Sequence, residues 1–193
     1  VTRILLADEI HDAFIERLRA RVATLRMGNP MNPSTSLGPV ISGPQMKRIL
    51  DYIDIGRQEG AVVVSGGERV GNRGYFIAPT IFTDVEGGMR IAQEEIFGPV
   101  VSVLRFHDED EALRLANGTP YSLAAAVWSR DIDRVHRVAE RLRAGTVWIN
   151  TYGPTDTRLP WGGTGGESGV GRDLGKAALE NYTEQKTVWL QLQ

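Results

Sequence analysis

Apolar residues recur along the chain in two alternating rhythms. Ile10, Phe14 and Leu18 follow one another at four-residue steps, which indicates an amphipathic helix ending near Gly28. Val100 to Phe106 instead alternates at two-residue steps, which is typical of a strand. Strands and helices of these lengths that follow one another favour a parallel sheet with helices on both faces. We therefore expect an α/β fold built on a doubly wound parallel sheet.

The same patterns place elements along the rest of the chain. Predicted strands or extended segments are Val1 to Ala7, Ala61 to Val64, Tyr75 to Phe82, Ala124 to Trp128, Thr146 to Ile149 and Thr187 to Leu192. Predicted helices are Pro44 to Glu59, one that begins at the capping residue Asp108, one that begins at Asp131, and Leu174 to Asn181. A strand already under way at Val1 predicts that the chain begins inside a fold.

Two features divide the end of the chain from the rest. Thr151 to Arg172 reads as a loop, and a structureless stretch of that length in a compact domain is usually functional. The final strand, Thr187 to Leu192, needs a sheet to join, because a lone strand leaves its backbone groups unpaired. We expect one domain over residues 1–173, and a short helix with an oligomerisation strand over residues 174–193.

Composition excludes several classes of protein. The 193 residues carry 22 Lys and Arg against 24 Asp and Glu, so no basic field exists to hold nucleic acid. The longest apolar run, Leu123 to Trp128, is far too short to cross a membrane, and no leader pattern opens the chain. We expect a soluble, cytoplasmic protein. The count of cysteines is 0, so the chain has no disulfide, no Cys-based zinc site and no thiol nucleophile.

The histidines predict neither nucleophilic catalysis nor metal binding. His11 and His136 fall on polar helix faces, and His107 falls at a turn between a strand and a helix. The chain contains no Gly-x-Ser-x-Gly turn and no His-Glu-x-x-His spacing. No metal site is therefore expected.

The glycine run from Gly162 to Arg172 has two interpretations. Its first is a loop that binds phosphate, which would make the chain a small-molecule-binding domain unrelated to redox chemistry. Neither Gly-x-Gly-x-x-Gly nor the Walker pattern fits the run, however, and no strand directly precedes it. The second is structural, because glycine lets a loop cross closely over a neighbour and adopt positive φ.

Glu94 and Glu95 precede Ile96-Phe97-Gly98-Pro99, a turn that leads into the strand from Val100. A carboxylate held by a turn at the edge of a parallel sheet is well placed to accept two hydroxyl groups, as from a ribose. A pair of acidic residues is otherwise commonly solvated or salt-bridged. The residues leave both interpretations open.

The segment Gln93 to Val100 (Gln-Glu-Glu-Ile-Phe-Gly-Pro-Val) resembles a signature of the NAD(P)-dependent aldehyde dehydrogenase superfamily. Several motifs in the correct order are far more specific than one, and here they span essentially the whole chain. The other matching segments are Met27 to Pro30, Leu37 to Pro39, Gly74 to Thr80, Tyr121 to Ala124, Gly145 to Asn150, Pro160 to Gly163, Ser168 to Gly175 and Tyr182 to Val188.

The resemblance implies a mechanism that this chain does not complete. In the family a cysteine thiolate attacks the aldehyde, hydride passes to the nicotinamide, and a glutamate activates water to hydrolyse the thioester. An upstream asparagine amide contributes to the oxyanion hole. By the family pattern, the cysteine would lie about three residues before Val1, and the glutamate and asparagine further upstream. The chain therefore resembles the C-terminal portion of the catalytic domain, beginning just after the nucleophile.

The resemblance also implies residues that bind the cofactor, NAD or NADP. Glu95 would accept hydrogen bonds from the hydroxyls of the nicotinamide ribose, and Phe97 would pack beside the nicotinamide. Gln45 and Arg48 match helix positions that reach the cofactor in relatives, where position 48 is commonly lysine.

Further residues match the substrate side of the family's site. Tyr152, Thr155 and Trp161 match positions that line the substrate tunnel, and Asn150 would brace the loop beneath the site. Tyr152 and Trp161 can offer an aromatic face to a cation or an apolar chain, or serve as core aromatics. The segment 164–167 has one residue more than the usual pattern, so the tunnel mouth is expected to differ.

These implications give one expected function and one alternative from another class. The intact enzyme would oxidise a small aldehyde to a carboxylic acid and form a homo-oligomer, a dimer or tetramer, through the C-terminal strand. The chain alone, without a cysteine, would be inactive. The alternative is a truncated, non-catalytic oligomerisation or regulatory module that docks on a full-length enzyme.

Overall fold

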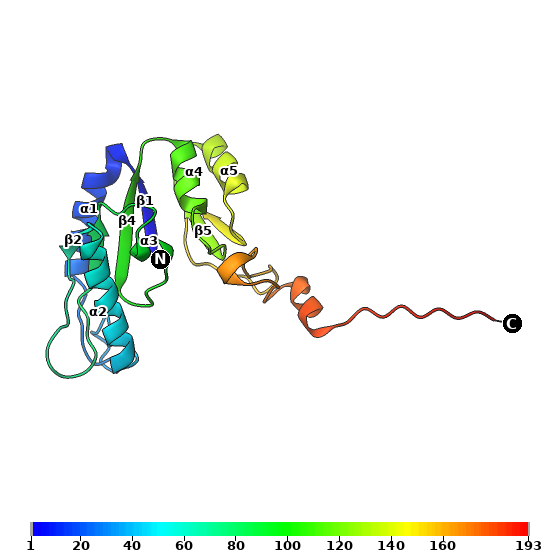
Figure 1. Ribbon diagram of the computed structural model, residues 1–193, viewed down its shortest axis with the longest axis horizontal. Helices are drawn as coiled ribbons and strands as arrows, with labels where there is room; N and C mark the ends of the chain where they lie inside the picture. Colours follow the sequence, from blue (N-terminus) through cyan, green and yellow to red (C-terminus); the bar gives the residue numbers. More distant parts are fainter. Residues whose placement is uncertain (1, 193) are drawn as a thin grey trace. The chain divides into compact units, whose positions relative to one another are not determined.

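A computed structural model describes residues 2–192, and these fall into two compact units (Figure 1). The first unit ends at Gly118 and the second begins at Thr119. The expected division between residues 173 and 174 lies inside the second unit and stays a prediction. No helix in the described range is long and apolar enough to span a membrane.

The first unit carries a four-stranded sheet in the order β1-β4-β3-β2. Strand β4 pairs in parallel with β1 on one side and β3 on the other, and Figure 1 shows β1 beside β4. The elements are β1 (Arg3–Ala7), α1 (Asp8–Ala23), α2 (Gly43–Gln58), β2 (Val62–Ser65), β3 (Thr80–Thr83), α3 (Arg90–Gln93), β4 (Val100–Phe106) and α4 (Glu109–Asn117).

The prediction of a wholly parallel sheet is wrong at β2, which runs antiparallel to β3. Parallel neighbours need a crossover, usually a helix, to bring the chain back to the same end of the sheet. Residues 66–79 contain no helix, and Gly66, Gly67, Gly71 and Gly74 all have positive φ. The turns therefore reverse the chain directly, and the sheet is mixed.

Helices cover both faces of this sheet, as expected of a doubly wound fold. On one face, Ile15 of α1 packs with Val103 of β4. On the other, Ile53 of α2 and Ile91 of α3 pack with Leu104 of β4. Adjacent positions of β4 thus serve opposite cores, as the two-residue period of a strand requires.

Side-chain caps begin two helices of the first unit, and the predicted cap at Asp108 is confirmed, whereas the cap at Ser42 was not predicted. The Ser42 hydroxyl accepts from the backbone N–H of Gln45 at 3.3 Å at the start of α2. The Asp108 carboxylate accepts from the N–H of Glu111 at 2.8 Å at the start of α4. Both caps satisfy N–H groups that the first turn of a helix leaves unpaired.

The second unit pairs two parallel strands, with the connecting helix expected from the sequence. Its elements are β5 (Ala124–Val127), α5 (Ile132–Arg141) and β6 (Thr146–Ile149), followed by the 3₁₀ helices η1 (Gly166–Ser168) and η2 (Lys176–Tyr182). The helix expected at Leu174 to Asn181 is therefore a 3₁₀ helix that starts and ends slightly later.

The last segment, from Thr183, belongs to no strand among residues 2–192. The side chains of Val188, Trp189, Leu190 and Leu192 are exposed, Trp189 by 93%. The strand expected at Thr187 to Leu192 pairs with no other strand of the described part of the chain, and its pairing with another subunit stays a prediction.

Candidate functional site

The turn between α3 and β4 places Glu95 and Phe97 at the surface of the first unit. Phe97 has a φ of 56° and is 69% exposed, which is unusual for a large aromatic residue. Gly98 lies directly on α2, because a Cβ there would meet the Cδ1 atom of Ile49 at 2.6 Å. Only glycine lets the turn approach the helix this closely.

A pocket of about 110 Å³ opens beside this turn. The lining residues include Glu95 and Phe97 from the turn, Thr2 just before β1, and Val100 at the start of β4. The pocket therefore lies at the amino ends of two neighbouring parallel strands. The Glu95 side chain is half-buried, and its carboxylate accepts no hydrogen bond from the described residues.

Gln45 and Arg48 extend from α2 to the backbone of the same turn. The Gln45 Nε2 donates to the carbonyl oxygens of Ile96 at 3.1 Å and Phe97 at 3.0 Å. The Arg48 Nη2 donates to the carbonyl oxygen of Glu95 at 3.1 Å. The structure thus brings together the four residues expected at the cofactor, with Gln45 and Arg48 holding the turn that carries Glu95 and Phe97.

Glu94 and Glu95 have different surroundings although they are neighbours. The Glu94 carboxylate accepts from Arg90 Nε at 2.7 Å and from Arg90 Nη2 at 2.9 Å, and it also accepts from the Tyr52 hydroxyl. The Arg90 and Tyr52 hydrogen bonds lower the pKa of Glu94 to about 2. The salt-bridged interpretation therefore holds for Glu94, while Glu95 keeps its carboxylate available.

Tyr152 and Trp161, expected on the substrate side, gather around Trp148 in the second unit. The ring centroid of Trp148 lies 5.0 Å from that of Tyr152 and 5.8 Å from that of Trp161. Such spacings are typical of tilted aromatic pairs. Tyr152 is 51% exposed, so the cluster is not sealed inside a core. Thr155 is exposed in the same loop, and no ring contact or side-chain hydrogen bond within residues 2–192 ties it to the cluster.

Asn150 ends β6 and braces the neighbouring turn. The backbone of Asn150 has a φ of 53°, and its side chain pairs twice with Ser129. The Asn150 Oδ1 accepts from the Ser129 N–H at 3.0 Å, and Nδ2 donates to the Ser129 carbonyl oxygen at 3.0 Å. The residue therefore has a bracing role in the segment after β5.

The glycine run folds as a tight crossing, which its structural interpretation predicts. A Cβ on Gly166 would lie 2.3 Å from the carbonyl oxygen of Pro120, and one on Gly145 would lie 1.7 Å from that of Gly162. The N–H of Thr164 donates to the Ser122 hydroxyl at 3.0 Å, so this donor is already used. The structural interpretation of the glycines explains these contacts.

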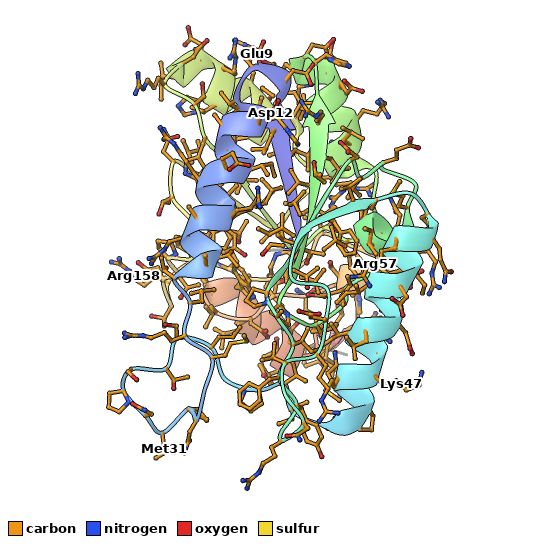
Figure 2. All side chains as sticks on the ribbon, turned by 90° about the vertical axis from the view of Figure 1, so that its left-hand side faces the viewer. Glu9, Asp12, Met31, Lys47, Arg57 and Arg158 are labelled. Atoms are coloured by element: carbon orange, nitrogen blue, oxygen red, sulfur yellow. The ribbon has the colours of Figure 1, made fainter. Side chains whose placement is uncertain are left out.

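The prediction that His11 lies on a polar helix face is wrong, because α1 turns this side chain towards Thr83 of β3. His11 is 3% exposed; its Nδ1 lies 2.8 Å from Asp12 Oδ1 and its Nε2 lies 3.2 Å from the Thr83 hydroxyl. Asp12, labelled in Figure 2, also accepts from Arg105 at 2.6 Å. Because His11 and Thr83 are both buried, no substrate can reach them. Within residues 2–192, no group of His, Cys, Asp and Glu side chains could hold a metal ion.

Sequence reasoning did not single out Trp148, Tyr52 or Arg90. Trp148 is the aromatic residue of the motif Gly145 to Asn150, and its place in that motif could have indicated it. Tyr52 and Arg90 lie far from each other in sequence, and no local pattern links them. Their roles follow from the packing of α2 against α3.

The comparisons with known proteins agree on one family. The pattern of the aldehyde dehydrogenase family matches residues 1–188. An aldehyde dehydrogenase of Emericella nidulans is 49% identical over 191 residues, covering 99% of this chain and 38% of the relative. A betaine aldehyde dehydrogenase of Mesorhizobium japonicum is 46% identical over 194 residues, covering 98% of this chain and 40% of the relative.

Solved structures show the same likeness in three dimensions. The NAD+ complex of an aldehyde dehydrogenase from Bacillus cereus is 43% identical, with a TM-score of 0.94, and the match covers 100% of this chain and 39% of that one. A betaine aldehyde dehydrogenase from Staphylococcus aureus in complex with NAD+ is 42% identical, with a TM-score of 0.90, and the match covers 99% of this chain and 41% of that one. The chain thus spans about two fifths of the length of these relatives.

Proposed function

The chain belongs to the aldehyde dehydrogenase family, and we propose that it forms the C-terminal part of the catalytic region of an NAD(P)-dependent aldehyde dehydrogenase. The overall reaction oxidises an aldehyde with water to a carboxylic acid, and the dinucleotide accepts the hydride. Because the 193 residues contain no cysteine, the nucleophilic thiol comes from upstream polypeptide. The chain alone is expected to be inactive.

The observation that carries this proposal is the free carboxylate of Glu95 in the pocket that it shares with Thr2. A half-buried carboxylate has lost hydrogen bonds to water and is stabilised by other hydrogen-bond donors. The two hydroxyls of a ribose can donate to its two oxygens. The exposed ring of Phe97 offers an apolar face beside it for the nicotinamide end of the cofactor. The structures of two relatives hold NAD+, which supports the choice of a nicotinamide dinucleotide as the cofactor.

Thr2 connects this pocket to the reacting centre in the proposal. The family pattern places the cysteine about three residues before Val1, and Thr2 lines the pocket together with Glu95. The proposal therefore places the thiol in the segment that leads directly to this pocket. The role of this chain is then to bind and orient the cofactor for hydride transfer.

For the substrate side we propose Tyr152, Thr155 and Trp161. The exposed ring of Tyr152 and the half-buried ring of Trp161 suit an apolar chain or a cationic group on the aldehyde. Two of the relatives above are betaine aldehyde dehydrogenases, so a cationic aldehyde and an uncharged aliphatic aldehyde are the two substrates to compare first.

We also propose that the protein forms a homo-oligomer, a dimer or tetramer, through Thr187 to Leu192. The exposed apolar side chains of this extended segment support the proposal, since joining a partner's sheet would pair its backbone groups and remove those side chains from water. Sedimentation of the chain and of a variant ending at Lys186 tests it. We expect only the longer chain to associate, and a monomeric longer chain would contradict the proposal.

The decisive experiment for the enzymatic proposal starts from the gene. We expect the coding sequence to continue upstream of Val1 and to encode a cysteine about three residues before it. In the encoded full-length protein, Glu95→Gln is expected to raise the KM for NAD or NADP at least ten-fold, with kcat and the KM for the aldehyde changing less. A start codon close to Val1 without an intervening cysteine would instead favour the non-catalytic module.

A further inference from the structure

Next to the Glu95 turn lies a cluster formed by Tyr52, Arg90 and Glu94, none of which lines the pocket. Glu94 accepts two hydrogen bonds from Arg90 and one from the Tyr52 hydroxyl. The Arg90 guanidinium also lies 5.4 Å from the centre of the Tyr52 ring. Charge-assisted bonds and a cation over an aromatic face both stabilise such a group. Tyr52 is therefore held at its hydroxyl and at its ring.

The ring of Tyr52 in turn supports Arg48. The Arg48 guanidinium carbon lies 5.0 Å from the ring centre, and its Nη2 lies 3.4 Å from the Tyr52 hydroxyl oxygen. The same Nη2 donates to the Glu95 carbonyl oxygen at 3.1 Å. A continuous path of contacts thus runs from Glu94 through Tyr52 and Arg48 to the backbone of Glu95.

Charge explains why this arrangement needs Glu94. Arg48 and Arg90 both approach the Tyr52 ring, and two like charges this close repel each other. The Glu94 carboxylate compensates Arg90, which leaves Arg48 free to bond the Glu95 carbonyl. Tyr52 itself is 6% exposed and does not line the pocket, so it cannot touch a ligand there.

We propose that Tyr52, held by Glu94 and Arg90, is a positioning residue that sets Arg48 against the Glu95 carbonyl and so aims the Glu95 carboxylate into the pocket. This inference rests on the proposed function of Glu95. The path also explains why the two adjacent acidic residues have different roles. Glu94 anchors the turn through Arg90 and Tyr52, whereas Glu95 lines the pocket.

The test uses Tyr52→Phe, which removes only the hydroxyl, and Glu94→Gln, which removes the charge but keeps a group that can accept a hydrogen bond. The matched control is Asp51→Asn on the same helix, which breaks the exposed pair of Asp51 with Lys47 at 2.6 Å. Figure 2 labels Lys47 on α2.

The first readout is amide hydrogen exchange of residues 94–98 in the 193-residue chain. We expect Tyr52→Phe and Glu94→Gln to speed the exchange of this segment several-fold, because the turn loses part of its support. Asp51→Asn is expected to leave the segment unchanged. Unchanged exchange in both test variants would overturn the proposal without any measurement of activity.

The second readout is a double-mutant cycle in the full-length protein. Tyr52→Phe is expected to raise the KM for the dinucleotide about five-fold with little change in the KM for the aldehyde, as loss of one hydrogen bond predicts. When Glu95→Gln is already present, adding Tyr52→Phe should have no further effect, because Tyr52 acts through Glu95. Independent, multiplying effects would contradict the positioning role.

The two proposals fail in different ways. If Glu95→Gln leaves the KM for the dinucleotide unchanged, the proposed function is wrong. If Glu95→Gln raises it and Tyr52→Phe does not, only the positioning role is wrong. If Tyr52→Phe does not fold, Glu94→Gln takes its place in the same cycle, with the same expected loss of effect beside Glu95→Gln.

Discussion

The turn at residues 93–98 and the loop at residues 160–173 are both irregular, yet they are held in different ways. Side chains from α2 and α3 hold the turn through Gln45, Arg48 and Arg90. The loop depends on close backbone approach, which only glycine permits at positions such as Gly145 and Gly166. An irregular segment can thus be held by polar side chains of neighbouring helices. Alternatively, glycines can let such a segment pack directly against another stretch of backbone.

The largest effect is expected from a substitution that disrupts the packing of the loop at residues 160–173. Gly145→Ala would place a Cβ 1.7 Å from the carbonyl oxygen of Gly162, and backbone atoms cannot rotate away. We expect a loss of about 3 kcal/mol or more in the free energy of unfolding, measured by urea denaturation. Gly169→Ala is the matched control, because Gly169 has a φ of 73° and open space around it.

For this control we expect a loss of about 1 kcal/mol, from the backbone conformation alone. Equal losses for Gly145→Ala and Gly169→Ala would show that close approach does not hold the loop.

The turn side is tested by comparing Glu94→Gln with Glu95→Gln in the 193-residue chain. Glu94→Gln removes a bidentate ion pair that is partly exposed, so we expect a loss of about 1 kcal/mol in stability. Glu95→Gln removes no hydrogen bond within residues 2–192 and is expected to leave the stability nearly unchanged. Thermal unfolding of both variants measures the difference, and a greater loss for Glu95→Gln would reverse the assigned roles.

The pH dependence of stability is a second test of the structural role of Glu94. The folded-state pKa of Glu94 is about 2, below its usual 4.5, so its ion pair stabilises the fold fully above pH 4.5. That contribution is lost as the pH falls from 4.5 towards 2. Over this interval, wild type should lose more stability than Glu94→Gln, as followed by thermal unfolding at a series of pH values. Parallel pH profiles for the two proteins would contradict this assignment.

The smallest expected effect concerns an ion pair outside both regions. His107 lies at the end of β4 and pairs with Asp8 at the start of α1, and the Asp8 hydrogen bond raises the pKa of His107. The pair therefore stabilises the fold below the ordinary histidine pKa and weakens as the pH rises through the raised value. Because His107 is exposed, the change should be slight.

The unfolding temperature between pH 5 and pH 8 measures this effect, with His107→Gln as the comparison. The variant should lack the part of the pH dependence that belongs to this pair. A pH profile that His107→Gln leaves unaltered would rule out the contribution.

Elements whose signals are local were predicted well. The strands Val100 to Phe106 and Thr146 to Ile149 have the expected bounds, and the capping role of Asp108 is confirmed. The strand β2 lies close to the predicted Ala61 to Val64, but its antiparallel direction was not predicted, because the direction of a strand depends on the path of the following loop. Of the two roles weighed for the acidic pair, the structure assigns the salt bridge to Glu94.

Periodicity, capping residues and glycines are signals that depend only on residues close together in the sequence. The amino-acid sequence was therefore enough to predict most helices, most strands and the long loop after Ile149. The family motifs, being local strings, pointed to the turn that carries Glu95. Tertiary packing alone decided that α2 holds this turn and that Tyr52 meets Glu94, 42 positions away. Such contacts depend on which helix face packs against which neighbour, and no short stretch of sequence encodes that.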